Sequence, residues 1–419
     1  MENFFICGGN KLNGTLNIST SKNAVLPILA GCILCDKQII LHKFPKYDDT
    51  KNMLNILQNL GAKYFYQDDS VIIDCSSIDK CEISIELASK IRSSFFSLGA
   101  ILSRFKKAKV AYPGGCAIGA RPIDIHLKGL QSLGVKIIDK HGYIYCDGTG
   151  MKSGDVTFDF PSVGATENIM LASVFLKGKT KIINCAREPE IVDLANFLNA
   201  QGAKIYGAGS SVIEIEGVKS LSGIEYTPIS DRIIAGTYMI ATCMCGGKVE
   251  LTNINYENVF SLISKLKNNC CKIVCKSDKL TVVADKRPKC ISKIDTRPYP
   301  GFPTDLQPQI IAMLSISKGT SVVVENLFES RFKHITELKK MGADIIVNDK
   351  AAIIKGVNQL YGANVMCCDL RGGAGMVLAG LVAKGYTTVC DVHHIDRGYF
   401  EMEKDLQLLG ANIERIKEI

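Results

Sequence analysis

The sequence of 419 residues is too long for one ordinary hydrophobic core, so two domains are expected. Its 47% hydrophobic and 22% charged residues are typical of a globular protein and exclude a disordered chain. The net charge of +8 is mild, and the chain has neither a long basic run nor a Trp for base stacking, so we expect no nucleic-acid partner.

The first residues and the apolar segments indicate neither a secretion signal nor a membrane anchor. The start, MENFFICGG, lacks a basic region followed by a long apolar stretch. The longest apolar runs, such as AVLPILAGCIL at 24–34, are too short to cross a bilayer. The 17 cysteines have no framework spacing and are typical of reduced thiols. We therefore expect a cytoplasmic protein without a membrane partner.

The cysteines and histidines give no metal-binding signature. CILC at 32–35 matches a CxxC pattern, but it lies inside an apolar helical pattern and is better explained by core packing. The chain has six His and no paired CxxC motifs, so we expect no structural zinc and no metal ion in the site.

One phrase recurs six times along the chain and predicts its architecture. The copies are LQNLGAKY (57–64), LQSLGVKI (130–137), LNAQGAKI (198–205), LKNNCCKI (266–273), LKKMGADI (338–345) and LQLLGANI (406–413). In each copy a helical pattern ends and a strand begins, with glycine as the expected left-handed cap. Cys270 replaces the glycine in the fourth copy.

The segments between these phrases complete the repeating unit. An apolar helix precedes a β-rich segment such as KGKTKIIN (177–184), GGKVELTN (246–253) or KGTSVVVEN (318–326). The unit is therefore strand, helix, strand, helix and a strand pair. Apolar helices such as GMVLAGLVA (375–383) should be buried, whereas amphipathic ones such as ITELKKMG (335–342) should lie outside.

Six units divide naturally into two sets of three. The polar segment GIEYTPISDR (223–232), between the third and fourth copies, is the expected crossing point. A solenoid is the alternative, but terminal repeats with the character of caps are not evident. We prefer two compact α/β domains with a cleft between them.

Charged and small polar residues gather where the apolar helices begin. These junctions read TSKNA (20–24), SKIRSS (89–94), SVGATEN (162–168), ISDR (229–232), GFPTD (301–305) and DLRGGAG (369–375). Helix capping is the simpler explanation for Ser162 and Asp231. It does not explain Lys22, Arg92 or Arg371, because a cation there opposes the helix dipole, so we expect these three to meet an anionic ligand.

Four arginines repeat this signal in the loops after the second strand of a unit. Arg187 follows Arg121 by 66 residues, and Arg397 follows Arg331 by 66 residues. Equivalent positions in repeats point the same way, so the pattern predicts a site lined by Lys and Arg for a small anion with several charges.

The segment PGGCAIGARP (113–122) places a thiol, Cys116, on a glycine-rich loop close to Arg121. Most other cysteines stand where a small apolar residue would serve, but this loop has almost nothing to bury. A nearby cation lowers a thiol pKa and increases its reactivity. An inert thiol on the loop is the alternative from these residues alone.

Together, SKNA, PGGCAIGARPIDIH, SVGATENIM, FPTDLQ, DLRGGA and DRGY resemble the enolpyruvyl transferases, and among them the branch that acts on UDP-N-acetylglucosamine. The resemblance runs from about residue 4 to residue 416. It implies two inverse (inside-out) α/β barrels, each of three βαβαββ units. It implies an N-terminal domain of residues 22–229, carrying the loop 113–122, and a C-terminal domain of residues 1–21 plus 230–419, with the active site in the cleft.

The resemblance also implies the substrates. The 3′-hydroxyl of UDP-N-acetylglucosamine would add to phosphoenolpyruvate, and phosphate would leave. Such an enzyme uses no cofactor. The implied catalytic residues are Cys116, Asp305, Lys22, Asp369 and Arg397. Those implied for phosphoenolpyruvate are Lys22, Asn23, Arg121, Arg331, Arg371 and Arg397. Those implied for the sugar nucleotide are Arg92, Arg121, Pro122, Ile123, Asp124, Ile125, Ser162, Val163, Gly164, Asp305 and Leu327.

Within this resemblance, Cys116 donates a proton to the methylene carbon, and Asp305 accepts the proton of the sugar hydroxyl. The nearest alternative is the shikimate-pathway enolpyruvyl transferase, which shares the repeats and cations but lacks the Gly-Gly-Cys loop. RNA terminal-phosphate cyclases have related repeats, but none of the six His has the context of a nucleotidylated histidine. A catalytically silent relative that binds the same sugar nucleotide is a third alternative, which Cys116, Asp305 and Lys22 disfavour.

Overall fold

The computed structural model describes residues 2–114, 123–267, 269 and 271–417. They form two compact units. The first unit runs from Thr20 to Ile229, and the second combines the residues up to Ser19 with those from Ser230 onward. The domain limits 22–229 and 1–21 plus 230–419 stay a prediction. Among the described residues, no helix combines the length and the apolar character needed to cross a membrane.

The first unit carries three four-stranded sheets. The first sheet is β14 (Glu225–Tyr226), β3 (Gln38–Leu41), β5 (Ser70–Asp74) and β4 (Lys63–Gln67). The second is β6 (Glu82–Ile83), β7 (Lys107–Ala111), β9 (Tyr143–Asp147) and β8 (Lys136–Lys140). The third is β10 (Asp155–Thr157), β11 (Lys179–Ile183), β13 (Val212–Glu216) and β12 (Lys204–Tyr206).

The second unit repeats this arrangement with three further sheets. They are, in spatial order, β2 (Leu12–Asn17), β15 (Gly247–Thr252), β17 (Lys279–Ala284) and β16 (Lys272–Lys276); β18 (Lys293–Asp295), β19 (Thr320–Val324), β21 (Ala351–Lys355) and β20 (Asp344–Asn348); and β22 (Asn364–Met366), β23 (Tyr386–Cys390), β1 (Glu2–Cys7) and β24 (Asn412–Lys417). In all six sheets the first pair is parallel and the other pairs are antiparallel.

The helices follow the predicted order within each repeat. In the first unit they are α1 (Lys22–Cys32), α2 (Asp48–Leu60), α3 (Ile85–Lys90), the 3-10 helix η1 (Arg92–Phe96), α4 (Ser97–Phe105), α5 (Asp124–Ser132), α6 (Val163–Ser173) and α7 (Pro189–Ala200). In the second they are α8 (Arg232–Cys245), η2 (Tyr256–Val259), α9 (Phe260–Lys267), η3 (Thr304–Leu306), α10 (Gln307–Ser315), α11 (His334–Lys340), α12 (Leu370–Val382), α13 (His393–Asp396) and α14 (Met402–Leu408). The predicted βαβαββ unit is confirmed, for example by β10, α6, β11, α7, β12 and β13.

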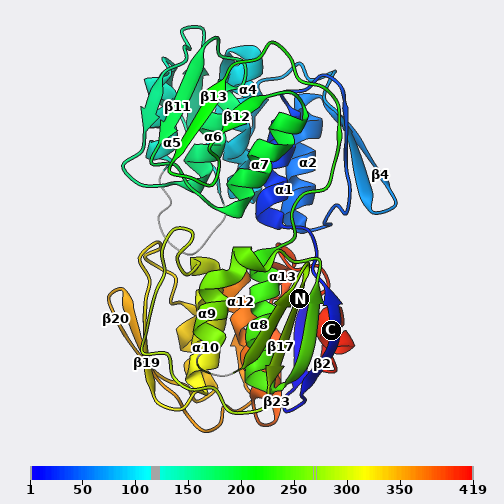
Figure 1. Ribbon diagram of the computed structural model, residues 1–419, viewed down its shortest axis with the longest axis vertical. Helices are drawn as coiled ribbons and strands as arrows, with labels where there is room; N and C mark the ends of the chain where they lie inside the picture. Colours follow the sequence, from blue (N-terminus) through cyan, green and yellow to red (C-terminus); the bar gives the residue numbers. More distant parts are fainter. Residues whose placement is uncertain (1, 115–122, 268, 270, 418–419) are drawn as a thin grey trace. The chain divides into compact units, whose positions relative to one another are not determined.

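Each unit has its apolar helices inside and its sheets outside, as Figure 1 shows for α8, α10 and α12 of the second unit. Every residue of α12 from Arg371 to Leu381 is buried. A helix that is apolar on nearly all sides is stable only when other elements surround it. This confirms the predicted inside-out α/β architecture. The amphipathic α11 places Lys339 and Lys340 at the surface.

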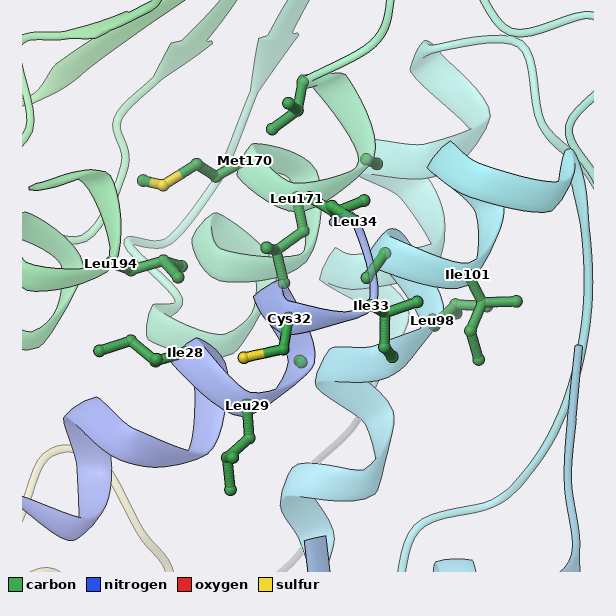
Figure 2. Packing of buried hydrophobic residues seen from close by; sticks show 14 of the residues in the cluster. Ile28, Leu29, Cys32, Ile33, Leu34, Leu98, Ile101, Met170, Leu171 and Leu194 are labelled. Carbon is green, nitrogen blue, oxygen red and sulfur yellow. The ribbon is translucent and has the colours of Figure 1, made fainter. Parts of the chain in front are cut away.

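The core of the first unit forms where its inner helices meet. Figure 2 shows Ile28, Leu29 and Cys32 of α1 close to Leu98 of α4 and Leu171 of α6. All five side chains are fully buried. Burial raises the pKa of the Cys32 thiol well above its usual value, with smaller contributions from Cys75 and Cys35. The CILC segment is therefore core packing, as predicted.

Glycine ends the outer helices as the repeat phrase predicts. Gly61, Gly134, Gly202, Gly342 and Gly410 have φ values of 118°, 90°, 103°, 91° and 94°. This left-handed region strains other residues, so the recurring glycine has a backbone cause. The exceptional fourth copy, Cys270, lies outside the described residues.

Three strands reach their sheets from distant parts of the chain. β14 comes after the third repeat of the first unit but pairs with β3 of the first repeat. β2 pairs with β15, and β1 lies between β23 and β24. The first 17 residues thus complete two sheets of the second unit, an exchange that the periodicity of the sequence does not reveal.

Candidate functional site

The start of α1 places a buried ion pair in the first unit. Lys22, the first residue of the helix, lies with its Nζ 3.2 Å from Oδ2 of Asp49, and the two side chains are 11% and 6% exposed. The Tyr47 hydroxyl donates to the Thr20 carbonyl at 3.1 Å and ties the two segments together. Asn23 is half-buried. Asp49 therefore provides part of the charge balance that the sequence analysis assigned to a ligand alone.

Three segments predicted for the sugar nucleotide meet around His126. A Cβ on Gly164 would lie 2.9 Å from Cε1 of His126 and 3.0 Å from Cε1 of Phe96, so only glycine fits between α5 and η1. The Asn168 amide donates to the Phe95 carbonyl and lies 2.8 Å from Nδ1 of His126. The structure thus brings together three predicted sets: Arg92, then Ile123, Asp124 and Ile125, and finally Ser162, Val163 and Gly164.

His126 gives this region a neutral and rigid centre. Burial and, to a smaller extent, the neighbouring charge of Arg92 lower the pKa of His126 to about 3. A neutral imidazole accepts the Asn168 hydrogen bond without adding a positive charge beside Arg92. Arg92 therefore keeps its positive charge without a competing imidazolium beside it.

Ser162 and Asp231 cap helices, as the simpler explanation predicted. The Ser162 hydroxyl accepts from the Ala165 amide at 3.4 Å at the start of α6. The Asp231 carboxylate accepts from the amides of Ile233 and Ile234 at 2.8 and 3.0 Å at the start of α8. Capping explains both side chains, and Ser162 remains half-buried beside Val163 and Gly164.

The second unit contains a carboxylate shared by two arginines, which we call the Asp305 cluster (Asp305, Arg331 and Arg371). Asp305 lies in η3, Arg331 precedes α11, and Arg371 lies in the first turn of α12. Oδ1 of Asp305 is 3.1 Å from Nη2 of Arg331. Oδ2 accepts from Nε and Nη2 of Arg371 at 3.2 and 3.0 Å. The structure therefore joins three predicted site residues from two consecutive repeats.

The arginines of the Asp305 cluster have unused hydrogen-bonding capacity. Both side chains are 3% exposed, whereas that of Asp305 is 28% exposed. Nε of Arg331 and Nη1 of Arg371 are buried and have no hydrogen-bond partner within the described ranges. Burial works to lower the pKa of Arg371, but Asp305, together with smaller contributions from Tyr399 and Asp231, outweighs burial and raises the pKa. A buried guanidinium N–H without an acceptor is costly, so these atoms indicate an anionic ligand.

Asp369 and His334 lie beside the cluster. The Asp369 carboxylate caps α12 by accepting from the amides of Arg371 and Gly372, each at 3.0 Å. Burial lowers the pKa of His334 to about 4, while Asp369 opposes that shift and Arg331 adds to it. Nδ1 of His334 lies 3.1 Å from the Arg331 carbonyl. A neutral imidazole therefore supports the arginine loop, and Asp369 fixes the helix start that carries Arg371.

Glu325 positions the other predicted residues of this unit, and the sequence analysis missed it. Its carboxylate accepts from the amide of Leu327 at 2.9 Å and from the hydroxyl of Thr304, next to Asp305, at 2.9 Å. Leu327 is half-buried on this loop. The sequence analysis also missed Asp49 and His334. All three act through contacts between segments, and none lies in a motif that indicates such a role.

Arg397 ends α13 and is half-buried. Together with Asp369 it influences the titration of His394, which places both charges near that imidazole. The Arg371 guanidinium lies 5.5 Å from the centre of the Tyr399 ring, two residues after Arg397. Arg397 thus lies in the part of the second unit that holds Asp369 and Arg371.

Cys116, Arg121 and Pro122 lie outside the described residues. The residue just before this segment, Gly114, donates its amide to the Ala88 carbonyl at 3.0 Å. A Cβ on Gly114 would lie 2.1 Å from the Ser89 carbonyl oxygen. The chain that follows β7 therefore packs closely against the end of α3. The roles of the three residues, and the cleft between domains, stay predictions.

Comparisons with known proteins identify relatives of this chain. The sequence pattern of the family described as EPSP synthase (3-phosphoshikimate 1-carboxyvinyltransferase) matches residues 6–406. UDP-N-acetylglucosamine 1-carboxyvinyltransferase 2 of Caldanaerobacter subterraneus subsp. tengcongensis is 48% identical over 99% of this chain and 100% of its own length. The protein of the same name from Carboxydothermus hydrogenoformans is 48% identical over the full length of both.

Solved structures show the same fold at lower identity. The enolpyruvyl transferase NikO from Streptomyces tendae superposes with a TM-score of 0.88 at 23% identity, covering 99% of both chains. An EPSP synthase from Acinetobacter baumannii gives a TM-score of 0.78 at 17% identity over the full length of both chains. At these identities the likeness establishes the fold alone.

Proposed function

This chain belongs to the carboxyvinyl (enolpyruvyl) transferase family, and we propose that it transfers the enolpyruvyl group of phosphoenolpyruvate to the 3′-hydroxyl of UDP-N-acetylglucosamine and releases phosphate. This is a step in the synthesis of the bacterial cell wall. Eight relatives over nearly the full length are 44–49% identical to this chain, and the names of all eight include UDP-N-acetylglucosamine. The family pattern is named for the shikimate enzyme, but the solved EPSP synthases are only 17% identical to this chain.

The Asp305 cluster is the observation that carries the proposal. Phosphoenolpyruvate has a carboxylate and a phosphate, and planar guanidiniums bind carboxylates with two parallel hydrogen bonds. The buried N–H groups of Arg331 and Arg371 that lack acceptors among the described residues suit such a carboxylate. We assign the phosphate to Lys22, Arg121 and Arg397. Asn23 contacts phosphoenolpyruvate as well.

Asp305 acts as the base that takes the proton from the 3′-hydroxyl. Its carboxylate accepts three N–H bonds from the two arginines, which makes it a poor proton acceptor. When the substrate carboxylate binds the same guanidiniums, it competes for those donors and releases Asp305 for proton transfer. The arrangement couples substrate binding to activation of the base.

The reaction then proceeds in two steps. Cys116 gives a proton to the methylene carbon of phosphoenolpyruvate, while the deprotonated hydroxyl oxygen bonds to the central carbon. The Cys116 thiolate then takes a proton from the new methyl group, and cleavage of the bond between carbon and phosphate oxygen restores the double bond and releases phosphate. Guanidinium and ammonium groups stabilise the charge of the leaving phosphate. Asp369 lies beside the reacting carbon.

We assign the sugar nucleotide to the residues that the family resemblance implies, and Arg92 and Gly164 of this set lie beside His126. The full set is Arg92, Arg121, Pro122, Ile123, Asp124, Ile125, Ser162, Val163, Gly164, Asp305 and Leu327. The 17 cysteines fit a reducing compartment, so we place the reaction in the cytoplasm.

A phosphate-release assay tests this proposal directly. The purified chain is incubated with phosphoenolpyruvate and UDP-N-acetylglucosamine, and released phosphate is measured together with the mass of the product. We expect one phosphate for each sugar nucleotide that gains a carboxyvinyl group. Shikimate 3-phosphate serves as the matched acceptor control. Release with shikimate 3-phosphate alone would identify the alternative enzyme, and no release with either acceptor would indicate a silent relative.

A further inference from the structure

Three metal-binding side chains lie together beside the end of β23, outside the residues assigned to the substrates. They are Asp391, His393 and His394, and one ligand atom of each lies within 4.8 Å of the other two. Nε2 of His394 is 3.7 Å from Oδ2 of Asp391, and Nδ1 of His393 contacts Oδ1 of the same carboxylate. The side chains of His393, His394 and Asp391 are 60%, 29% and 22% exposed, so an ion can reach them from solvent.

The backbone that carries these donors is fixed by the fold. Val392 and Ile395, which alternate with the donors, are fully buried. The Asp391 amide donates to Oδ1 of Asn3 at 3.1 Å, and the Val392 amide donates to the Glu2 carbonyl at 3.1 Å. Asp391 and Val392 are therefore tied to β1. Little reorganisation of the backbone is needed to bring the three donors to one ion.

The spacing of the donors suits a small transition-metal ion. Metal–nitrogen and metal–oxygen bonds of about 2.0–2.1 Å place neighbouring ligand atoms about 3.0 Å apart in an octahedral site and about 3.3 Å apart in a tetrahedral one. The observed 3.7 Å between Asp391 and His394 is close to both values. Side-chain rotations close the remaining gap, because the His393 side chain is 60% exposed.

The donor set also selects the class of ion. Imidazole suits zinc, nickel, copper and cobalt, whereas calcium and magnesium require mainly oxygen ligands. Two imidazoles and one carboxylate leave the remaining coordination positions to water or to a small anion. We propose that Asp391, His393 and His394 bind a divalent first-row transition-metal ion.

This proposal departs from the expectation that the chain binds no metal. That expectation rested on the lack of paired CxxC motifs and on the small number of histidines. The proposed site instead uses the short spacing Asp-x-His-His on one loop. Arg397 follows His394 by three residues, so an occupied site would lie close to a residue of the proposed phosphate clamp. The binding of an ion does not depend on the transferase activity, and either can fail without the other.

Calorimetric titration of the full-length protein with Ni²⁺ tests the site. The variants are His393→Ala and Asp391→Asn, and His141→Ala is the matched control, because His141 is another exposed histidine on a turn. Any Ni²⁺ binding by cysteines is the same in the wild type and the three variants. Differences in Ni²⁺ affinity between these proteins therefore report on the site of Asp391, His393 and His394. Loss of a ligand should weaken binding by at least about 10–100-fold, the range known for weaker outer-sphere partners. The control should bind as the wild type does.

Histidine NMR signals identify the site independently. The chain has six His, so selective isotope labelling of histidine gives few ring signals. Paramagnetic Ni²⁺ should broaden the signals of His393 and His394 first and leave those of His42 and His141 sharp. Equal Ni²⁺ affinity of wild type and His393→Ala, or earlier broadening at another histidine, would overturn the proposal. Unchanged circular dichroism of the variants shows that the fold is retained.

Discussion

The two units hold their buried cations in different ways. In the first unit the Lys22 ammonium faces the Asp49 carboxylate at 3.2 Å. In the second unit the single Asp305 carboxylate serves two guanidiniums that are each 3% exposed. Two arginines therefore share one anion, and two of their N–H groups lack an acceptor among the described residues.

This difference separates a preformed ion pair from a site that is prepared for an anion. A buried cation with a carboxylate of its own gains less free energy from a further anion than a cation that shares its carboxylate, because more of its charge is already balanced. An excess of buried guanidinium gains both charge balance and hydrogen bonds when a carboxylate binds. Substrate binding should therefore affect the second unit more strongly than the first.

Replacement of Asp305 should give the largest effect on catalysis. Asp305→Asn keeps a hydrogen-bond acceptor beside Arg331 but removes the base, so turnover should fall by about 10²–10⁴-fold. Phosphate release under saturating substrates measures this. Glu214→Gln is the matched control, because Glu214 pairs with the surface lysines Lys179 and Lys181, and it should keep normal turnover. Near-normal turnover of Asp305→Asn would remove Asp305 from the mechanism.

Arg371→Lys tests the carboxylate-binding role of the guanidinium. Lysine keeps the charge but loses the paired N–H groups, so the KM for phosphoenolpyruvate should rise by about 10–100-fold. The KM for the sugar nucleotide should change much less. Arg287→Lys provides the control, because Arg287 binds the carbonyls of Ile316, Ser317 and Val357 in the same unit. An equal rise in both KM values would contradict a specific role for Arg371.

In the first unit, removal of one charge should mainly cost stability. Asp49→Asn removes a negative charge from beside buried Lys22, and the free energy of unfolding should fall by about 1–3 kcal/mol. Asp48→Asn is the neighbouring control. Asp48 pairs with Lys51 at the surface, with side chains 49% and 53% exposed, and should change stability by less than about 1 kcal/mol. Denaturant titration measures the free energy of unfolding of both variants. Equal losses in Asp49→Asn and Asp48→Asn would contradict a stabilising role of the Lys22–Asp49 pair.

Both units should also lose stability in acid because of one buried histidine each. The pKa of His126 is lowered to about 3 and that of His334 to about 4, while the unfolded chain has an ordinary value near 6.5. The unfolded state therefore binds protons first as pH falls. Stability is fully present above pH ~6.5 and should decrease below it by about 1.4 kcal/mol per pH unit for each histidine.

His126→Asn isolates this effect in the first unit. The Asn carbonyl can replace Nδ1 as acceptor for Asn168, but it does not titrate. The variant should show a shallower loss of stability between pH 6 and 4, by about 1.4 kcal/mol per pH unit. His141→Asn, an exposed control, should retain the wild-type slope. An unchanged slope in His126→Asn would show that His126 is not the group that titrates.

Much of this architecture could be predicted from the sequence because it depends on local patterns. The left-handed glycines and the apolar inner helices follow from turn geometry and periodicity, and they predicted six α/β units. The origin of β14, β1 and β2 could not be predicted from these patterns, since each pairs with a strand far away in the sequence. Only the resemblance to a family implied that the N-terminal strand crosses over.

The cations of the site could be predicted from their position at helix starts, but their partners could not. Nothing near Asp49 in the sequence distinguishes it from Asp48, although Asp49 is buried and Asp48 is only half-buried. The contact of Asp305 with Arg331 and Arg371 spans 26 and 66 residues and depends on how repeats pack. Sequence patterns therefore indicated an anion site. The packing shows that the Asp305 carboxylate accepts hydrogen bonds from the arginines of that site.

The central claim is that Asp305 competes with the substrate carboxylate for Arg331 and Arg371. Calorimetric binding of phosphoenolpyruvate, without sugar nucleotide, to Asp305→Ala and to its parent tests this most directly. Both proteins should carry Cys116→Ser, so that no covalent bond to the thiol contributes. The account predicts that Asp305→Ala binds phosphoenolpyruvate more tightly than its parent, because two buried guanidiniums have lost their anion. Weaker or unchanged binding in Asp305→Ala would contradict the account.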